Sequence, residues 1–109
     1  MHPLIIINKI TTMEERIRER LNESKNTEIK DLNVFLASYH YGIYRIVYIF
    51  DGKRVTFTFV CECEEAKLYL KFLRGEFIDE SEEEEIEDFL VSLGETLIDN
   101  NFEDYEYYE

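Results

Sequence analysis

Residues 43–61 read IYRIVYIF-DG-KRVTFTFVC, two runs rich in β-branched and aromatic residues that flank Asp51-Gly52. Asp-Gly tolerates the positive φ angles of a two-residue type I′ turn, so the stretch predicts a β-hairpin. The turn also sets the register, because Phe50 must face Lys53 across it. One face of the hairpin is then apolar, with Tyr44, Ile46, Tyr48, Val55, Phe57 and Phe59. The other face carries Arg45, Arg54, Thr56 and Thr58, together with Val47 and Ile49.

The segment before the hairpin has two interpretations. Its apolar residues recur at helical spacing in one reading (Ile29, Leu32, Leu36, Tyr39) and alternate as in a strand in the other (Phe35, Ala37, Tyr39). If Tyr41-Gly42 is a second two-residue turn, the alternating set falls on the apolar face: Tyr39 opposite Tyr44, Ala37 opposite Ile46, and Phe35 opposite Tyr48. A wrong register would place polar residues there. We therefore predict that residues 33–40 form a strand, which makes the sheet a three-stranded meander. The alternative is a helix within residues 28–40.

The N-terminal part predicts a strand followed by a helix. Leu4–Ile7 is a short β-branched run, typical of a buried strand. Thr12 and Glu15 have the spacing of a capping box, which predicts that a helix begins there and ends near Ser24. An apolar stripe on that helix repeats every four residues: Met13, Ile17 and Leu21.

Two helices are expected after the hairpin. The first covers Glu64–Arg74 and stops at Gly75. The second begins at a capping box of Ser81 and Glu84 and covers about Glu82–Ile98. The sequence thus predicts one α+β domain over residues 1–109, with an acidic C-terminal helix and tail. Its sheet is an antiparallel meander of about three strands plus an N-terminal strand, packed against two to three helices.

The charge of the chain is very unevenly distributed. The 109 residues include 25 acidic and 12 basic side chains, for a net charge of −13. Residues 1–61 carry nine Lys/Arg and seven Asp/Glu, whereas residues 62–109 carry three and eighteen. Because like charges repel, this balance argues against direct binding to nucleic acid or to an anionic membrane. Abundant Glu without Gln is also a tendency of hyperthermophiles, compatible with a hot-living archaeal microbe or its virus.

No motif for catalysis, for a metal or for a cofactor is present, so we expect a protein that is not an enzyme. A pairing of His40 with Cys61 or Cys63 is conceivable, but strand alternation puts His40 and Cys61 on opposite faces. The two cysteines lack the usual spacing of zinc ligands. Two free thiols, together with no apolar run near 18 residues and no signal-peptide pattern, predict a cytoplasmic protein.

The basic residues of the N-terminal half gather in two places: Lys9, Arg16, Arg18 and Arg20 on the first helix, and Arg45 and Arg54 on the open face of the hairpin. Together with nearby aromatic residues they could contact a nucleic acid. The overall negative charge opposes that contact. We therefore expect these residues to pair within the helix or with the acidic half of the chain.

The acidic half is the predicted partner-binding surface. Its candidate residues are Glu76, Asp79, Glu80, Glu82, Glu83, Glu84, Glu85, Glu87, Asp88, Glu103, Asp104, Tyr105, Tyr107 and Tyr108. Carboxylates on a rigid helix resemble the phosphates of a nucleic-acid strand in sign and density, and tyrosines supply interface anchors. In physical character the chain resembles the nucleic-acid mimics that viruses use against restriction or CRISPR effectors. It therefore predicts an inhibitor of a basic, nucleic-acid-handling protein; the alternatives are a homodimeric assembly protein and a small enzyme.

Overall fold

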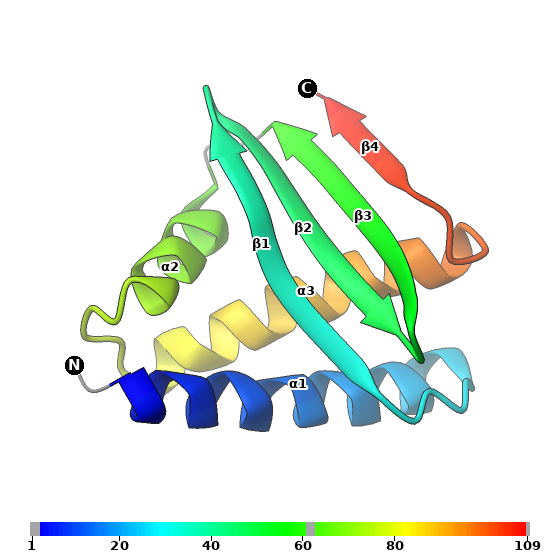
Figure 1. The fold of residues 1–109 in the computed structure, drawn as a ribbon, viewed down its shortest axis with the longest axis horizontal. Helices are drawn as coiled ribbons and strands as arrows, with labels where there is room; N and C mark the ends of the chain where they lie inside the picture. Colours follow the sequence, from blue (N-terminus) through cyan, green and yellow to red (C-terminus); the bar gives the residue numbers. More distant parts are fainter. Residues whose placement is uncertain (1–2, 61–62, 109) are drawn as a thin grey trace.

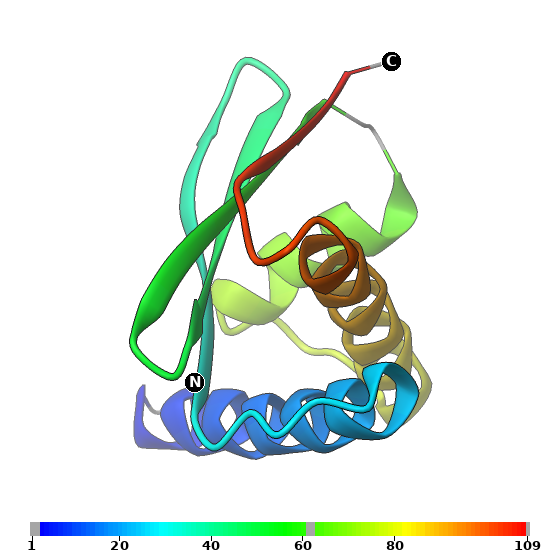
Figure 2. The same cartoon turned by 90° about the vertical axis from the view of Figure 1, so that its right-hand side faces the viewer.

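The structure is a computed structural model that describes residues 3–60 and 63–108, with side chains described from residue 8 onward. In chain order its elements are α1 (Pro3–Lys25), β1 (Leu32–His40), β2 (Ile43–Phe50), β3 (Lys53–Val60), α2 (Glu64–Leu73), α3 (Glu80–Asp99) and β4 (Tyr105–Tyr108). The strands form one sheet in the order β1-β2-β3-β4, in which only the β3–β4 pair is parallel. α2 and α3 cover one face of this sheet and α1 runs across its end (Figures 1 and 2). The predicted α+β class is confirmed.

The central hairpin has the predicted register. Phe50 pairs with Lys53 and the pairing continues without a shift along β2 and β3. Asp51 and Gly52 both have positive φ angles (49° and 87°), as a type I′ turn requires. The preceding turn at Tyr41-Gly42 has the same signature, with φ angles of 51° and 77°. The meander of β1, β2 and β3 is therefore confirmed, and with it the strand interpretation of 33–40.

The register of β1 is only partly as predicted, because a β-bulge lies between Leu36 and Ser38. Tyr39 faces Tyr44 as expected. Two predicted pairs are wrong by one residue. Leu36, and not Ala37, lies opposite Ile46, and Val34, and not Phe35, lies opposite Tyr48. The extra residue of a bulge reverses the facing of the strand beyond it. It turns the aliphatic side chains of β1 toward the helices and leaves Phe35 36% exposed on the open face.

The predicted N-terminal strand is wrong, since Leu4–Ile7 lies within α1. The predicted start of the helix at Thr12 is wrong for the same reason. Thr12 lies inside α1, where its hydroxyl donates to the carbonyl of Asn8 at 2.9 Å, a bond that threonine can make in a helix interior. Ile10 packs against the core and extends the apolar stripe of α1 upstream of Met13, so the helix continues past the apparent cap.

The ends of α2 and α3 show which capping signals hold. α2 stops before Gly75 as predicted. The structure shows that the stop is a Schellman motif: Gly75 has a φ of 78°, its N–H donates to the carbonyl of Phe72, and the N–H of Glu76 donates to that of Lys71. The predicted capping box of α3 is wrong by two residues. Asp79 accepts from the backbone N–H of Glu82 at 2.9 Å, and the Glu82 carboxylate accepts from the N–H of Asp79 at 3.2 Å. α3 thus begins at Glu80, two residues earlier than expected for a Ser81 cap.

The core fixes α3 on two sides. Ile86, Leu90 and Leu97 are buried against the sheet and α1. Gly94 lies where α3 meets α1, and a Cβ there would come within 2.9 Å of Leu21 Cδ1 and 3.3 Å of Tyr48 Cε2. The buried Tyr48 hydroxyl donates to the carbonyl of Leu90. Only the outward side of α3 is therefore open to another molecule.

Candidate functional site

The side of α3 that faces α1 is neutralised by cations of α1. Both helices run from left to right in Figure 1 and cross at an angle in Figure 2, and four basic residues of α1 reach α3. The pairs are Lys9 with Glu83 (3.2 Å), Arg16 with Glu87, Arg20 with Glu87 (2.9 Å) and Asp88 (2.7 Å), and Lys25 with Asp99 (2.9 Å). This confirms the expected pairing of Lys9, Arg16 and Arg20 with the acidic half.

Glu87 is at the centre of this seam. Its side chain is only 13% exposed, and its two carboxylate oxygens bind different arginines, Arg16 and Arg20. Burial alone would lower the pKa of Arg20, but hydrogen bonds and charge attraction from Asp88 and Glu87 outweigh it, so the pKa is raised. Arg18 points elsewhere: it donates to the carbonyl of Ile29 at 3.2 Å and lies 3.9 Å from Glu19.

The outward side of α3 has no such cations. Glu80, Glu84 and Glu85 are exposed and make no ion pair with any residue that the structure describes. Asp88 is also 67% exposed although Arg20 binds it. We call Glu80, Glu84, Glu85 and Asp88 the acidic ridge. It presents negative charge to solvent along the first half of α3.

A shallow groove borders the acidic ridge on the side of α2. It has a volume of about 350 Å³ and is lined by Glu65, Glu85, Asp88, Phe89 and Ser92. Glu65 of α2 thus faces carboxylates of α3 across a surface to which Phe89 contributes an aromatic ring. A groove of this composition suits an arginine or lysine side chain, whose stem packs on the ring while its charge meets carboxylates.

The remaining acidic candidates near the start of α3 have structural partners. Asp79 and Glu82 form the capping box, in which each binds a backbone N–H of the other. Glu76 lies 3.9 Å from Arg74, just after α2. These three, together with Glu83 and Glu87, are therefore less available to a partner than the acidic ridge is.

The predicted tail residues lie apart from the acidic ridge. β4 forms the far edge of the sheet, whereas α3 begins on the opposite side of the molecule (Figure 1). Tyr105 packs against Phe57 with ring centroids 5.2 Å apart, and Asp104 accepts from the N–H of Thr56 at 2.9 Å. Tyr107 and Tyr108, with Glu103, are exposed. The structure therefore divides the predicted surface into two separate parts. The carboxylates of α3 form one part, and the tyrosines of the tail form the other.

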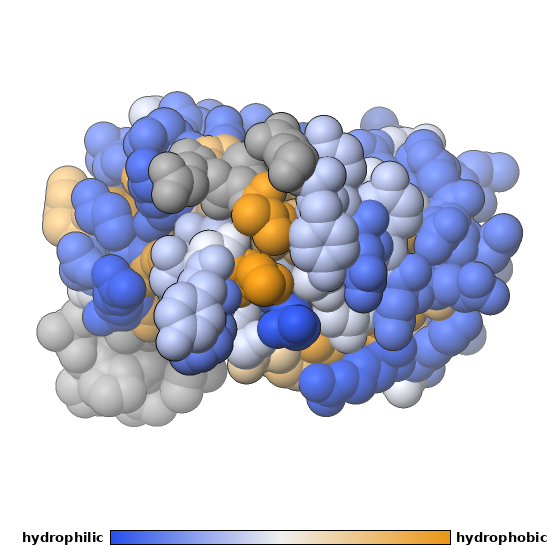
Figure 3. All heavy atoms as spheres, turned by 90° about the horizontal axis from the view of Figure 1, so that it is seen from above, coloured by the Kyte–Doolittle hydropathy of each residue, from blue (hydrophilic) through white to orange (hydrophobic). Residues whose placement is uncertain are grey.

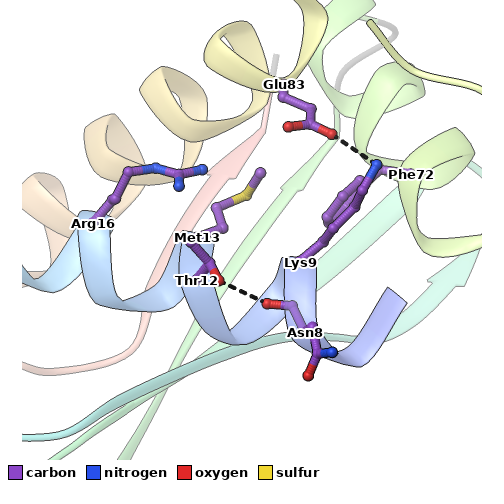
Figure 4. A pocket seen from close by; sticks show the side chains of 7 residues that line it. All are labelled: Asn8, Lys9, Thr12, Met13, Arg16, Phe72 and Glu83. Carbon is purple, nitrogen blue, oxygen red and sulfur yellow. Dashed lines mark hydrogen bonds and ion pairs between the residues drawn. The ribbon is translucent and has the colours of Figure 1, made fainter. Parts of the chain in front are cut away.

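A second pocket lies between α1, the end of α2 and the start of α3 (Figure 4). Its volume is about 260 Å³, and its lining residues are Asn8, Lys9, Thr12, Met13, Arg16, Phe72 and Glu83. In Figure 4 the Lys9 side chain reaches from α1 to Glu83 near the start of α3. Both cations of the pocket are bound to carboxylates of α3, so the pocket offers an incoming anion no free positive charge.

The histidine and cysteine candidates form no catalytic group in the described residues. His40 is exposed at the end of β1, where its ring contacts Tyr41 at 4.2 Å. Cys63 is half-buried at the start of α2 and packs against the core, while Cys61 and His2 lie outside the described residues. No three His, Cys, Asp or Glu side chains in the described ranges are close enough to hold a metal ion. In those ranges, too, every helix is too short or too polar to cross a membrane.

One half-buried carboxylate has a structural partner that the sequence did not reveal. Glu14 of α1 accepts from the backbone N–H of Val34 in β1 at 2.7 Å. Burial raises the pKa of Glu14, while hydrogen bonds from Val34 and Asn33 partly lower it. Burial also raises the pKa of the neighbouring Tyr69, and the charge of Glu14 adds to that rise. The hydrogen bond between Glu14 and Val34 links α1 to β1.

Sequence reasoning also missed Glu65 and Phe89 as members of the groove. A signal for them exists in the helical spacing. Glu85, Asp88 and Ser92 fall on one side of α3, opposite the apolar stripe, and Glu65 is on the acidic first turn of α2. Comparison of the chain with models of protein families, with curated proteins and with solved structures finds no match.

Proposed function

We propose that this protein is a non-enzymatic binding protein that docks its acidic ridge into the basic site of a nucleic-acid-handling protein and thereby inhibits it. The observation that carries the proposal is the division of α3. Its inward carboxylates are neutralised by four cations of α1, whereas Glu80, Glu84 and Glu85 are exposed and meet no cation of the described residues. Uncompensated charge on one side of a helix adds self-repulsion, which a basic partner would relieve.

The spacing of the free carboxylates supports a nucleic-acid-like surface. Residues 80 to 85 span about 7.5 Å of helix axis at 1.5 Å per residue, and three unpaired carboxylates lie in that span. A single strand of duplex DNA carries one phosphate per about 3.4 Å of axis. The two linear charge densities are therefore similar, and Glu65 adds a further charge across the groove.

The rigidity of α3 is the second support. The capping box holds its first turn, buried residues hold its length, and Gly94 allows close contact with α1. A surface that is already ordered loses little conformational entropy when it binds. A net charge of −13 also accelerates the encounter with a basic partner at low ionic strength. A partner of this class would place the protein in the cytoplasm of its host.

The test reverses charge on the acidic ridge in the double variant Glu84→Lys, Glu85→Lys. The matched control is Glu23→Lys, Glu28→Lys, which changes two exposed carboxylates outside α3 and gives the same net charge. Each protein is immobilised, exposed to an extract of its source cells and eluted with a salt gradient. Proteins retained by the wild type are then purified, and their affinity for the variants and for duplex DNA is measured.

We expect the ridge variant to bind about a hundredfold more weakly, because each reversed charge costs about tenfold at an electrostatic interface, whereas the control stays within about threefold. Duplex DNA should displace the partner from the wild type. Equal affinity of both variants, or a partner that DNA does not displace, would contradict the proposal. Thermal unfolding followed by circular dichroism checks that both variants are folded.

A further inference from the structure

The two edges of the sheet differ in how they are covered. At the β1 edge, the Glu14 carboxylate of α1 binds the N–H of Val34, and the β-bulge between Leu36 and Ser38 interrupts the strand. Both devices protect an edge from pairing with another chain. The β4 edge has neither. Apart from the ladder to β3, the described residues make no hydrogen bond to the backbone of Tyr105–Tyr108.

An aromatic row crosses the sheet and ends at this uncovered edge. It consists of one residue from each strand, in register: Tyr39, Tyr44, Phe59 and Tyr107. The two central rings are buried and stack at 4.9 Å, whereas Tyr107 is 48% exposed. Figure 3 looks down on this end, where apolar and weakly polar side chains occupy the centre of an otherwise hydrophilic face. A further strand beside β4 would cover Tyr107 and continue the row.

The charges beside β4 determine which strand can bind there. Glu103, Asp104 and Glu106 are all exposed. The same edge of a second copy would bring an equal set of carboxylates against them, and like charges that face each other across a strand pair are destabilising. A segment rich in lysine or arginine would instead place positive charges beside these carboxylates, and opposite charges across a strand pair are stabilising.

We propose that the β4 edge takes an extended basic segment of the partner as a fifth strand of the sheet. The inference deepens the proposed function, because it assumes the same basic partner and names how one segment of it is held. Backbone hydrogen bonds to an edge strand supply affinity in this mode, and alternate side chains supply specificity.

The register of β4 specifies the pattern of that segment. Tyr105 and Tyr107 pair with Phe57 and Phe59, which face the helices, whereas Glu106 pairs with Thr58 on the open face. Since side chains alternate along a strand, apolar residues of the segment would lie beside Tyr105 and Tyr107. Basic residues between them would lie beside Glu106 and the ring of Tyr108. The preferred segment therefore alternates lysine or arginine with valine or isoleucine.

The test uses a fluorescein-labelled peptide of alternating Lys and Val, about seven residues long, which spans β4 at about 3.3 Å per residue. Its affinity for the full chain is measured by fluorescence anisotropy. A second peptide carries N-methyl groups on alternate backbone nitrogens, which keeps its charge but prevents strand pairing on one edge. Methylation on the pairing edge removes backbone hydrogen bonds to β4. A tenfold change in affinity corresponds to only about 1.4 kcal/mol, so we expect binding to weaken at least about tenfold.

Two protein variants locate the peptide. Glu106→Lys should weaken binding about tenfold, whereas Glu23→Lys, at an exposed carboxylate of α1 outside both proposed surfaces, should leave it within about twofold. Both residues are exposed, so both variants are expected to fold. NMR cross-peaks between peptide amides and the amides of Tyr105–Tyr108 would support the added strand directly.

Three results would overturn the inference. One is equal affinity for both peptides, which would indicate charge attraction without pairing. Another is loss of binding in Glu85→Lys with Glu106→Lys unaffected, which would place the peptide on the acidic ridge. The last is concentration-dependent sedimentation of the free protein that Glu106→Lys changes, which would assign the edge to a second copy. Peptide binding at β4, together with unchanged capture by the ridge variant, would instead contradict only the proposed function.

Discussion

The two long sides of α3 carry the same acidic residue types in different surroundings. On the side toward α1, Glu83 and Glu87 meet lysine and arginine within 3.2 Å, and Arg20 also binds Asp88 of the acidic ridge. On the outward side, Glu84 and Glu85 face solvent and the groove beside Glu65. The comparison teaches that the negative charge of the chain cannot be treated as one surface. Part of it holds the two helices together, and only the rest is available to another molecule.

The largest expected effect comes from forcing α3 away from α1 and the sheet at Gly94, which packs against Leu21 and Tyr48. Gly94→Val adds a branched side chain where even a Cβ would approach Leu21 Cδ1 to 2.9 Å. Overpacking of a close-packed core costs about 1–3 kcal/mol, so we expect a loss near 3 kcal/mol in the free energy of unfolding. Urea denaturation measures it. Ser92→Ala, on the outward side of the same helix, is the control and should change stability by no more than about 0.5 kcal/mol.

The next effect compares the two sides directly. Glu87→Gln removes the charge that Arg16 and Arg20 share, and we expect it to cost about 1–2 kcal/mol of unfolding free energy, because charged hydrogen bonds are stronger than neutral ones. Glu84→Gln removes an exposed charge and should cost less than about 0.5 kcal/mol. Chemical denaturation at low and high salt measures both. Equal losses in the two variants would contradict the division of α3 into a paired and a free side.

The smallest effect concerns Glu14 of α1, a carboxylate that pairs with no cation in the part of the chain that the structure describes. Burial raises the pKa of Glu14 above its ordinary value of 4.5, so the folded protein binds this proton more tightly than the unfolded chain does. The resulting stability is present below pH 4.5 and is lost as the pH rises through the folded pKa. Glu14→Gln should therefore be at least as stable as the wild type at neutral pH, since an amide oxygen can still accept from Val34.

The measurement for Glu14 is the free energy of unfolding of both proteins across the acidic pH range. The advantage of the variant should shrink as the pH falls below 4.5, where the wild-type carboxyl is protonated. Glu15→Gln, at the neighbouring position, is the control, because it shows how much the loss of one negative charge changes the unfolding free energy by itself. An advantage that grows toward low pH would show that the interpretation of Glu14 has the wrong sign.

Glycine-containing turn and stop signals predicted the fold well, whereas the capping boxes expected at Thr12 and Ser81 were wrong. Asp51-Gly52 specifies its turn by the backbone angles it tolerates, and Gly75 specifies the end of α2 in the same way. The pairing of Lys9, Arg16 and Arg20 with acidic residues also followed from the sequence, because uncompensated charge opposes folding. Each of these predictions rests on a strong local preference or on total charge.

Predictions that depended on distant parts of the chain were less successful. The bulge in β1 has no local signature, since Phe35 and Leu36 are both suitable for an interior position, and packing against the helices selects Leu36. Leu4–Ile7 has strand propensity, but its inclusion in α1 shows that context overrides so weak a preference. The separation of the tail from the acidic ridge depends on β4 pairing with β3, which the intervening helices determine.

The parallel pairing of β4 with β3 also has a consequence for folding and aggregation. β1, β2 and β3 join through two-residue turns, whereas Thr56 and Asp104, which bond at the start of the β3–β4 pair, are 48 positions apart. Contacts between residues so distant in sequence form late, because the chain must first lose the entropy of a long loop. Until β4 docks, β3 is itself an uncovered edge with the side chains of Val55, Phe57 and Phe59 beside it. The four residues of β4 therefore protect the nascent sheet from self-association.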